Sequence, residues 1–421
     1  MSDRDALLAA IRAHPDEDTP RLVYADYLEE NDDRARAAFI RTQVESARTP
    51  PWEPFAVRVR WRQPDTVSGK AFRKDLPSVP GSVAEWPSEP FRRGLAWAFT
   101  LHTASMWHRF AEPLFEQFPL GKLFLSQGML DDWMRVAASG NVRQFRELVF
   151  NLSPIEPLYA LRDKPDICGV TDLHFRRASG AGMPEVIEDL FRSPLGGAVR
   201  GLHFHTGYES LNDLIDALNT GGPLERLSFS VMGLTADLIR KLFDGQAGSA
   251  LKELRVRDER LGDEGLEALA DTLPAGLNDL ELSKIDTRGG GLESLARSER
   301  LAGLRRLNLS RNPLTPRAAK VLAQSHVLAG LRSLDLTECG IDARFVRHIV
   351  RSKFWWNLVE LDLRKNPIGA TGVKHLLDAP VPPALTALAL DGDALGGDSR
   401  TALIKKYGEA VRFAATEVQG W

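Results

Sequence analysis

The stretch LRRLNLSRNPL at residues 304–314 decides the fold, because its leucines recur along the chain. The pattern Leu-x-x-Leu-x-Leu starts at residues 224, 251, 277, 304, 331, 358 and 385, at intervals of 26 or 27 residues. Weaker copies start at residues 120, 145, 170 and 199. A period held over so many copies is typical of a repeat array and argues against a single enzyme core.

Each copy predicts one strand followed by one helix. The alternation of leucine with polar residues predicts a short strand with one buried face. Further along the copy, aliphatic residues recur at helical spacing, as at Leu266, Leu269 and Ala270. One such unit buries too little apolar surface to offset the conformational entropy lost on ordering it, so the units must stack and share their apolar faces.

The units resemble leucine-rich repeats of the ribonuclease-inhibitor-like class, in which the motif LxxLxLxxN/CxL precedes a helix. Asn312, Cys339 and Asn366 occupy the Asn/Cys position. The resemblance implies an α/β solenoid with a curved parallel sheet inside and helices outside. It also implies that the Asn/Cys side chain hydrogen-bonds the turn between repeats. We expect a looser ladder of turns in three other copies, where the position holds Met232, Glu259 and Ile285.

The first residues form a different kind of unit. The stretches HPDEDTPRLVYADYLEE and RARAAFIRTQ resemble the short repeat-companion domain found at the N-terminus of bacterial proteins that carry repeat arrays. We therefore expect a small helical domain at residues 1–48 and a repeat array with a cap at each end at residues 91–421. Between them, residues 49–90 hold eight of the 25 prolines, which predicts an extended linker.

Composition excludes several classes of protein. The net charge of −3 gives no overall attraction to nucleic acid or to an anionic membrane. The two cysteines lie far apart, which excludes a disulfide framework and suits a reducing compartment. We find no signal-peptide pattern and no apolar run of about 20 residues. These features predict a cytoplasmic monomer without a cofactor or a membrane segment.

No enzyme motif is found: the phosphate loop GxxxxGK[ST], HExxH and GxSxG are all missing from the sequence. The sequence therefore predicts a non-catalytic protein-interaction scaffold. Polar residues between the strand leucines should line the concave face of the array and bind a protein partner. The candidate contact residues are Arg226, Glu253, Arg255, Arg257, Asp279, Glu281, Arg306, Asn308, Asp335, Glu360, Asp362 and Arg364, with Trp356 as an exposed aromatic anchor.

Two alternatives remain open at this point. His174 and His203 share one position in neighbouring copies, with His205 on the same face, and imidazoles at strand spacing could hold Zn²⁺. Segment 58–74 interleaves basic and aromatic residues, as binders of single-stranded nucleic acid do. Its members are Arg58, Arg60, Trp61, Arg62, Lys70, Phe72, Arg73 and Lys74.

Overall fold

The computed structural model describes residues 2–61, 70–79, 81, 84–88, 90–151, 155–164, 167, 169–176, 182–205, 211–287, 289–392 and 395–414. The chain divides into two compact units. Unit 1 comprises Met1–Pro50 and Arg62–Gly222, and unit 2 comprises Pro51–Trp61 and Pro223–Trp421.

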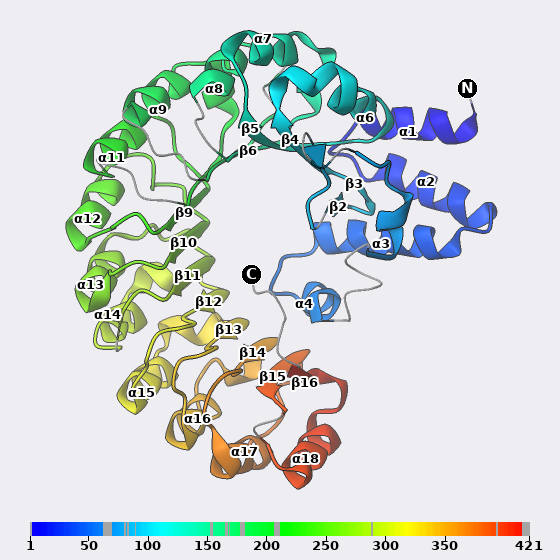
Figure 1. Ribbon diagram of the computed structural model, residues 1–421. Coiled ribbons are helices and arrows are strands. Elements are labelled where there is room, and N and C mark those ends of the chain that lie inside the picture. Colours follow the sequence, from blue (N-terminus) through cyan, green and yellow to red (C-terminus); the bar gives the residue numbers. More distant parts are fainter. Residues whose placement is uncertain are drawn as a thin grey trace. The chain divides into compact units, whose positions relative to one another are not determined.

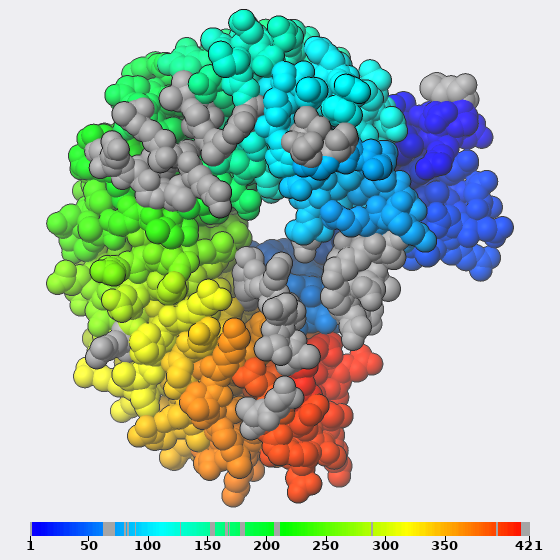
Figure 2. Space-filling view, in the orientation of Figure 1, coloured from blue at the N-terminus to red at the C-terminus, as the bar shows by residue number. Residues whose placement is uncertain are grey.

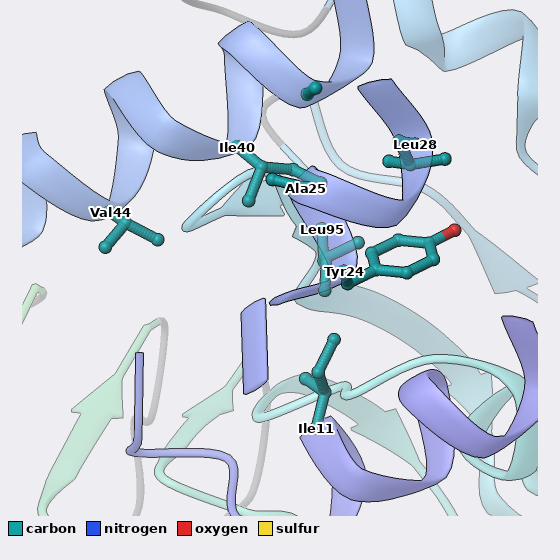
Figure 3. Packing of buried hydrophobic residues seen from close by; sticks show 8 residues of the cluster. Ile11, Tyr24, Ala25, Leu28, Ile40, Val44 and Leu95 are labelled. Atoms are coloured by element: carbon teal, nitrogen blue, oxygen red, sulfur yellow. The ribbon is translucent and has the colours of Figure 1, made fainter. Parts of the chain in front are cut away.

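Unit 1 begins with three helices, α1 (Asp3–Ala13), α2 (Thr19–Glu30) and α3 (Arg34–Arg48). Figure 3 shows their shared core, in which Leu95 packs among the side chains of the helices. Leu95 belongs to the short strand β3 (Leu95–Ala96), which pairs with β2 (Phe91–Arg92). Arg146 of the repeats also forms an ion pair with Asp16, at 2.8 Å. The helices are thus bound to the start of the repeat array, and their existence as a companion domain of their own, residues 1–48, stays a prediction.

The sheet of unit 1 is mostly parallel. Its strands follow the order β1 (Ala84–Glu85), β4 (Ala98–Thr103), β5 (Lys122–Gln127), β6 (Glu147–Phe150), β7 (Asp172–Phe175) and β8 (Gly201–Phe204), and only β1 is antiparallel to its neighbour. The helices between them are α6 (Glu112–Gln117), α7 (Leu130–Ala138), α8 (Ile155–Leu161), α9 (Met183–Phe191), α10 (Pro194–Ala198) and α11 (Leu211–Asn219).

Aromatic rings fill the core of these repeats. Phe150, Phe175 and Phe204 hold the same register on β6, β7 and β8. Their rings are stacked with centroids 5.4 Å and 5.2 Å apart. All three side chains are buried. Stacked rings bury more apolar area per position than leucine does, so they can hold neighbouring repeats together where the repeat length is irregular.

Unit 2 is a regular parallel array. Its strands follow chain order: β9 (Arg226–Ser230), β10 (Glu253–Arg257), β11 (Asp279–Ser283), β12 (Arg306–Asn308), β13 (Ser333–Asp335), β14 (Glu360–Asp362), β15 (Ala387–Asp391) and β16 (Val411–Ala414). Its repeat helices are α12 (Ala236–Asp244), α13 (Gly262–Thr272), α14 (Leu292–Arg297), α15 (Pro316–Gln324), α16 (Ala343–Ile349), α17 (Gly369–Asp378) and α18 (Gly397–Tyr407). Figure 1 shows these strands along the inner side of the unit and the helices along its outer side, and in Figure 2 consecutive repeats follow one another as contiguous layers, from green to red. The predicted leucine-rich-repeat solenoid is confirmed.

The turn after each strand from β9 to β14 contains a residue in the left-handed region. These residues are Val231, Asp258, Lys284, Arg311, Glu338 and Lys365, with φ between 51° and 59°. The position recurs at the repeat period, directly before the Asn/Cys position. The left-handed conformation costs a residue with a Cβ about 1–2 kcal/mol, so the turn needs compensating hydrogen bonds.

The Asn/Cys position supplies these bonds. Asn366 accepts hydrogen bonds from the backbone N–H groups of Cys339 and Ile341 and donates to carbonyl groups of Leu336 and Leu363. Asn312 bonds Ile285, Leu282 and Leu309 in the same manner. The Sγ of Cys339 lies 3.1 Å from the Leu309 carbonyl oxygen, and burial raises the pKa of this thiol to about 12. Cys339 and the asparagines therefore have a structural role.

Glu259 departs from the motif and still closes the turn of the preceding repeat. Its buried carboxylate accepts hydrogen bonds from the backbone N–H groups of Met232, Gly233 and Leu234, at 2.6–3.0 Å. The expectation of a looser turn at Glu259 is wrong, because a carboxylate offers the acceptors that the turn requires. Burial raises the pKa of Glu259 against the lowering effect of these bonds.

The proline-rich segment 49–90 is more ordered than its composition predicts. It contains the helix α4 (Pro54–Trp61) and the 3-10 helix η1 (Lys70–Asp75). Pro54 opens α4, where its missing N–H would have no helical partner and so costs nothing. The prediction of an extended chain is therefore wrong for α4. This helix belongs to unit 2, although it is distant in sequence from the other residues of that unit.

Candidate binding surface

The polar strand residues of unit 2 form two rows across the inner face of the sheet. Strand pairing aligns the first row as Arg226, Glu253, Asp279, Arg306, Ser333, Glu360 and Ala387. The second row is Ser228, Arg255, Glu281, Asn308, Asp335, Asp362 and Ala389. The leucines between the rows are buried on the helix side of the sheet. The strand register thus brings polar residues of neighbouring repeats side by side.

Charges in these rows pair with one another across the strands. Arg257 binds Glu281 through two hydrogen bonds of 2.5 Å and 2.6 Å. Arg306 lies 2.9 Å from the carboxylate of Asp279, with both side chains buried. Arg255 pairs with Glu253 at 2.7 Å on its own strand. The carboxylates of β10 and β11 therefore neutralise arginines of β10 and β12.

This pairing changes which residues a partner could reach. Glu253 and the arginines 226, 255 and 257 are half-buried on β9 and β10. The remaining strand candidates are buried, contrary to the expectation that they face solvent: Asp279, Glu281, Arg306, Asn308, Asp335, Glu360, Asp362 and Arg364. Strands about 4.8 Å apart hold these side chains against their neighbours. Pairing with an opposite charge offsets the hydration that a buried charge loses.

Two carboxylates lie side by side near the C-terminal end of the rows. Asp335 is aligned with Asp362 on the next strand. Burial raises the pKa of Asp335, and the nearby Asp362 raises it further. Asp362 binds Arg364 through both carboxylate oxygens, with the shortest distance 2.6 Å. One charge of the pair is thus neutralised by an arginine, and a proton on Asp335 neutralises the other most readily.

The helix α4 occupies the inner face beside this carboxylate pair. Arg60 donates to Glu360 at 2.7 Å, and the indole N–H of Trp61 donates to the other oxygen of Glu360 at 2.5 Å. The guanidinium group of Arg364 lies 5.0 Å from the ring centroid of Trp61. Figure 1 draws α4 on the strand side of β14 and β15, away from α16 and α17. This contact joins residues about 300 positions apart in the sequence.

Apolar and charged contacts extend the docking of α4 to neighbouring strands. Val57 packs in a buried cluster with Val359 and Ala387. Glu53, just before the helix, lies 3.1 Å from Arg332. Sequence reasoning missed this docking, although one signal was present. Glu53, Val57, Arg60 and Trp61 follow the spacing i, i+4, i+7, i+8, which predicts one helical face.

Trp356 is exposed as expected, with 54% of its surface accessible. It lies in the short 3-10 helix η8 (Trp355–Asn357), before β14 and outside the strand rows. Its neighbour Trp355 is buried and donates to the Pro380 carbonyl group. A role of Trp356 as an anchor stays a prediction, and it would be separate from the rows.

The three histidines come together in unit 1. His174 and His203 are aligned on β7 and β8, and their rings stack at 4.1 Å, with His205 at 6.3 Å from His174. Burial, and then the charge of His203, lower the pKa of His174. His203 also faces Asp172 at 3.4 Å. Within the described residues, no group of three or more His, Cys, Asp or Glu side chains is arranged to hold a metal ion.

The described residues of the basic segment 58–74 are divided between the two units. Arg60 and Trp61 bind Glu360 in unit 2, as described above. In unit 1, Arg73 donates to the carbonyl groups of Trp86 and Ser88, and Phe72 packs on Phe39. Arg62 lies outside the described residues. The described charges and rings of this segment are therefore largely engaged within the protein.

Comparison with known proteins agrees with the repeat geometry. The leucine-rich repeat family model matches residues 250–270 and 357–377. No curated protein matches the chain. In the described part of the chain, no helix has both the length and the apolar character needed to cross a bilayer.

Several solved structures are similar to this chain at low sequence identity. An internalin of Listeria monocytogenes is 17% identical, with 63% of this chain and 71% of that chain covered and a TM-score of 0.40. A chain of the yeast Rad7–Elc1 complex is 16% identical over 76% of this chain and 82% of that chain, with a TM-score of 0.41. A chain of the TLR13–ssRNA13 complex is 14% identical over 76% of this chain and 54% of that chain, also with a TM-score of 0.41.

Because these TM-scores are low, the family assignment depends on the repeat itself. The motif recurs at 26 or 27 residues, its strands pair in parallel register, and the family model matches two copies. The chain is a leucine-rich repeat protein.

Proposed function

We propose that the protein is a non-catalytic scaffold that binds a protein partner on the inner face of unit 2. The observation that supports this most is the docking of α4, because it demonstrates that this face accepts a short helix through charged, aromatic and apolar contacts. Carboxylates of β10 and β11 pair with arginines of β10 and β12. This mixed charge favours a protein surface over a polyanion, whose phosphates require a basic stripe.

The half-buried residues of β9 and β10 are the part of the rows that a partner reaches without rearrangement. The candidate contact residues in this sector are Arg226, Glu253, Arg255 and Arg257. Each of these side chains keeps part of its surface open to solvent. The buried candidates lie between Asp279 and Arg364. Among them, Glu281 pairs with Arg255 and Arg257 and so reduces the positive charge of β10.

The test is to recover the partner from native cells with the full chain and to measure its affinity for two variants. Arg255→Glu reverses a charge in the β10 sector and should weaken binding at least tenfold, about 1.4 kcal/mol. Arg297→Glu is the matched control, because Arg297 also pairs with a glutamate but lies on the outer helix α14 with its side chain 76% exposed. Equal affinity of the two variants, both folded by circular dichroism, would place the partner elsewhere.

A further inference from the structure

The docked face of α4 has a definite chemical order. An acidic residue, Glu53, is followed by an aliphatic residue, Val57, and then by Arg60 and Trp61. Each of them meets a complementary group: Glu53 pairs with Arg332, Val57 packs on Val359 and Ala387, and the last two bind Glu360. In the same helix Arg58 is exposed, so the helix has a docked face and a solvent face.

Glu360 is the centre of the site. It is 1% exposed, and its two oxygens accept from Arg60, Trp61 and the hydroxyl group of Ser333. If α4 leaves, only the Ser333 bond remains among these, and the carboxylate loses its arginine partner. Departure of α4 removes a charge-assisted hydrogen bond and the indole hydrogen bond from this carboxylate. The site therefore favours a segment that restores the cation and the indole donor.

The indole of Trp61 is recognised at two points. Its N–H binds the Glu360 carboxylate, and its ring lies against the guanidinium group of Arg364. Arg364 is held by its bidentate pair with Asp362, whose shortest distance is 2.6 Å. A ring that donates at its edge and accepts a cation on its face fits this place, while leucine or phenylalanine lacks the donor.

Helix α4 cannot be stable on its own. It has eight residues, and two of them are valines, which lose side-chain entropy in a helix. Isolated helices shorter than about 12–15 residues are marginal in water. The segment is therefore helical because it is docked, and its release from the sheet is coupled to unfolding of the helix.

We propose that Glu360, Val359 and Ala387 form a docking site for a partner helix that carries an aliphatic residue followed, three and four positions later, by Arg and Trp, and that α4 is an internal occupant that this partner displaces. A tethered segment competes at an effective concentration in the millimolar range. Because the docked α4 competes for the site, a segment that binds weakly or lacks these side chains does not displace it. This inference rests on the proposed function, since it names the chemistry that the same face recognises.

The test uses the full chain and a fluorescein-labelled synthetic peptide of residues 50–61, followed by fluorescence anisotropy. The variant Arg60→Ala/Trp61→Ala removes the internal competitor and should bind the peptide at least tenfold more tightly than the native chain does. Arg58→Ala is the matched control: it removes one arginine from the exposed side of α4 and should bind as weakly as the native chain. Val57→Asp releases α4 by a different contact and should reproduce the gain.

The receptor side is tested with Glu360→Gln in the released variant. It keeps the shape of the side chain but loses its charge, so peptide affinity should fall about tenfold. A peptide with alanine in place of Arg60 and Trp61 should not bind. Equal binding by the native and both released chains, binding by none of them up to millimolar protein, or no effect of Glu360→Gln would each overturn the proposal.

The outcome is separable from that of the proposed function. The peptide assay uses no native partner, and it can fail while Arg255→Glu still weakens partner binding. Conversely, if the peptide binds as expected but Arg255→Glu has no effect, the Glu360 site stands and the β9–β10 sector is removed from the account.

Discussion

The repeats of unit 1 and those of unit 2 are held together by different chemistry. In unit 2 the turns are closed by buried polar side chains, Asn312, Asn366 and Glu259, that bond the backbone of the neighbouring repeat. The described residues of unit 1 contain a stack of phenylalanine rings, of which Phe175 is the centre. A polar ladder fixes the repeat length, because each bond needs its acceptor at one position, whereas stacked rings tolerate variation.

This difference bears on the proposed binding face of unit 2. The regular ladder of unit 2 keeps its strands in register, so that charged residues of neighbouring repeats pair and the face accepts α4 as a unit. The four predictions that follow test the comparison between the aromatic stack and the polar ladder, from the largest expected effect to the smallest.

Phe175→Ala should destabilise unit 1 most. It removes the central ring of a fully buried stack and leaves a cavity, which costs about 3–5 kcal/mol. Chemical denaturation followed by circular dichroism measures the loss. Phe175→Leu keeps most of the volume and should cost clearly less. If both variants lose little, the stack does not hold the repeats of unit 1 together.

Asn366→Ala should destabilise unit 2 by about 2–3 kcal/mol. It leaves the buried N–H groups of Cys339 and Ile341 without their acceptor, and each unsatisfied group costs about 1–3 kcal/mol. Asn357→Ala removes an asparagine whose bond to Ala329 is exposed, and it should cost less than about 1 kcal/mol. Similar losses for the two variants in the same denaturation experiment would argue against the ladder.

Asp335→Asn should stabilise unit 2 by about 1–2 kcal/mol at neutral pH, since it replaces a buried carboxylate beside Asp362 with a neutral group. Asn308 holds the equivalent position in the preceding repeat and accepts from Ser310 as Asp335 accepts from Thr337, so asparagine fits. Because the folded-state pKa of Asp335 is raised, the folded chain keeps a proton that the unfolded chain has lost. The resulting stabilisation is present at low pH and is lost as pH rises through the folded-state pKa.

The check is the free energy of unfolding of the native chain and of Asp335→Asn at several pH values between 4 and 8. The free energy of unfolding of Asp335→Asn should exceed that of the native chain by an amount that grows as pH rises. An advantage that is constant with pH, or that shrinks, would mean that Asp335 is ionised without cost in the folded protein.

Val231→Gly should have the smallest effect, a gain below about 1 kcal/mol. Val231 has φ of 58°, which is unfavourable for a β-branched residue, and glycine adopts this conformation freely. The greater entropy of glycine in the unfolded chain offsets part of the gain. The measurement is the thermal unfolding of Val231→Gly and of Val231→Ala. The alanine variant keeps a Cβ in the left-handed region and should show no such gain in stability.

The fold was predictable because it depends on a local pattern repeated many times. Leu-x-x-Leu-x-Leu fixes both the buried face of each strand and the interval between strands, and Asn312 and Asn366 mark the turns. The role of Glu259 was missed because the motif names residue types, while the turn requires only an acceptor of suitable reach.

The candidate surface was predictable only in part. The sequence places the polar residues in rows, but exposure depends on how neighbouring charges pair, as at Arg306 and Asp279. The docking of α4 is a contact between residues about 300 positions apart, and proline content alone pointed to an extended linker. Helical spacing of Val57, Arg60 and Trp61 was the only local signal of that contact.

Amide hydrogen exchange of residues 54–61 tests the central claim most directly, which is that this segment is held as a helix on the inner face of unit 2 by Glu360. The account predicts protected amides in the native chain and in Arg58→Ala. It predicts fast exchange, at the rate of an unfolded peptide, in Arg60→Ala/Trp61→Ala. Fast exchange of these amides in the native chain, or equal protection in all three chains, would contradict it.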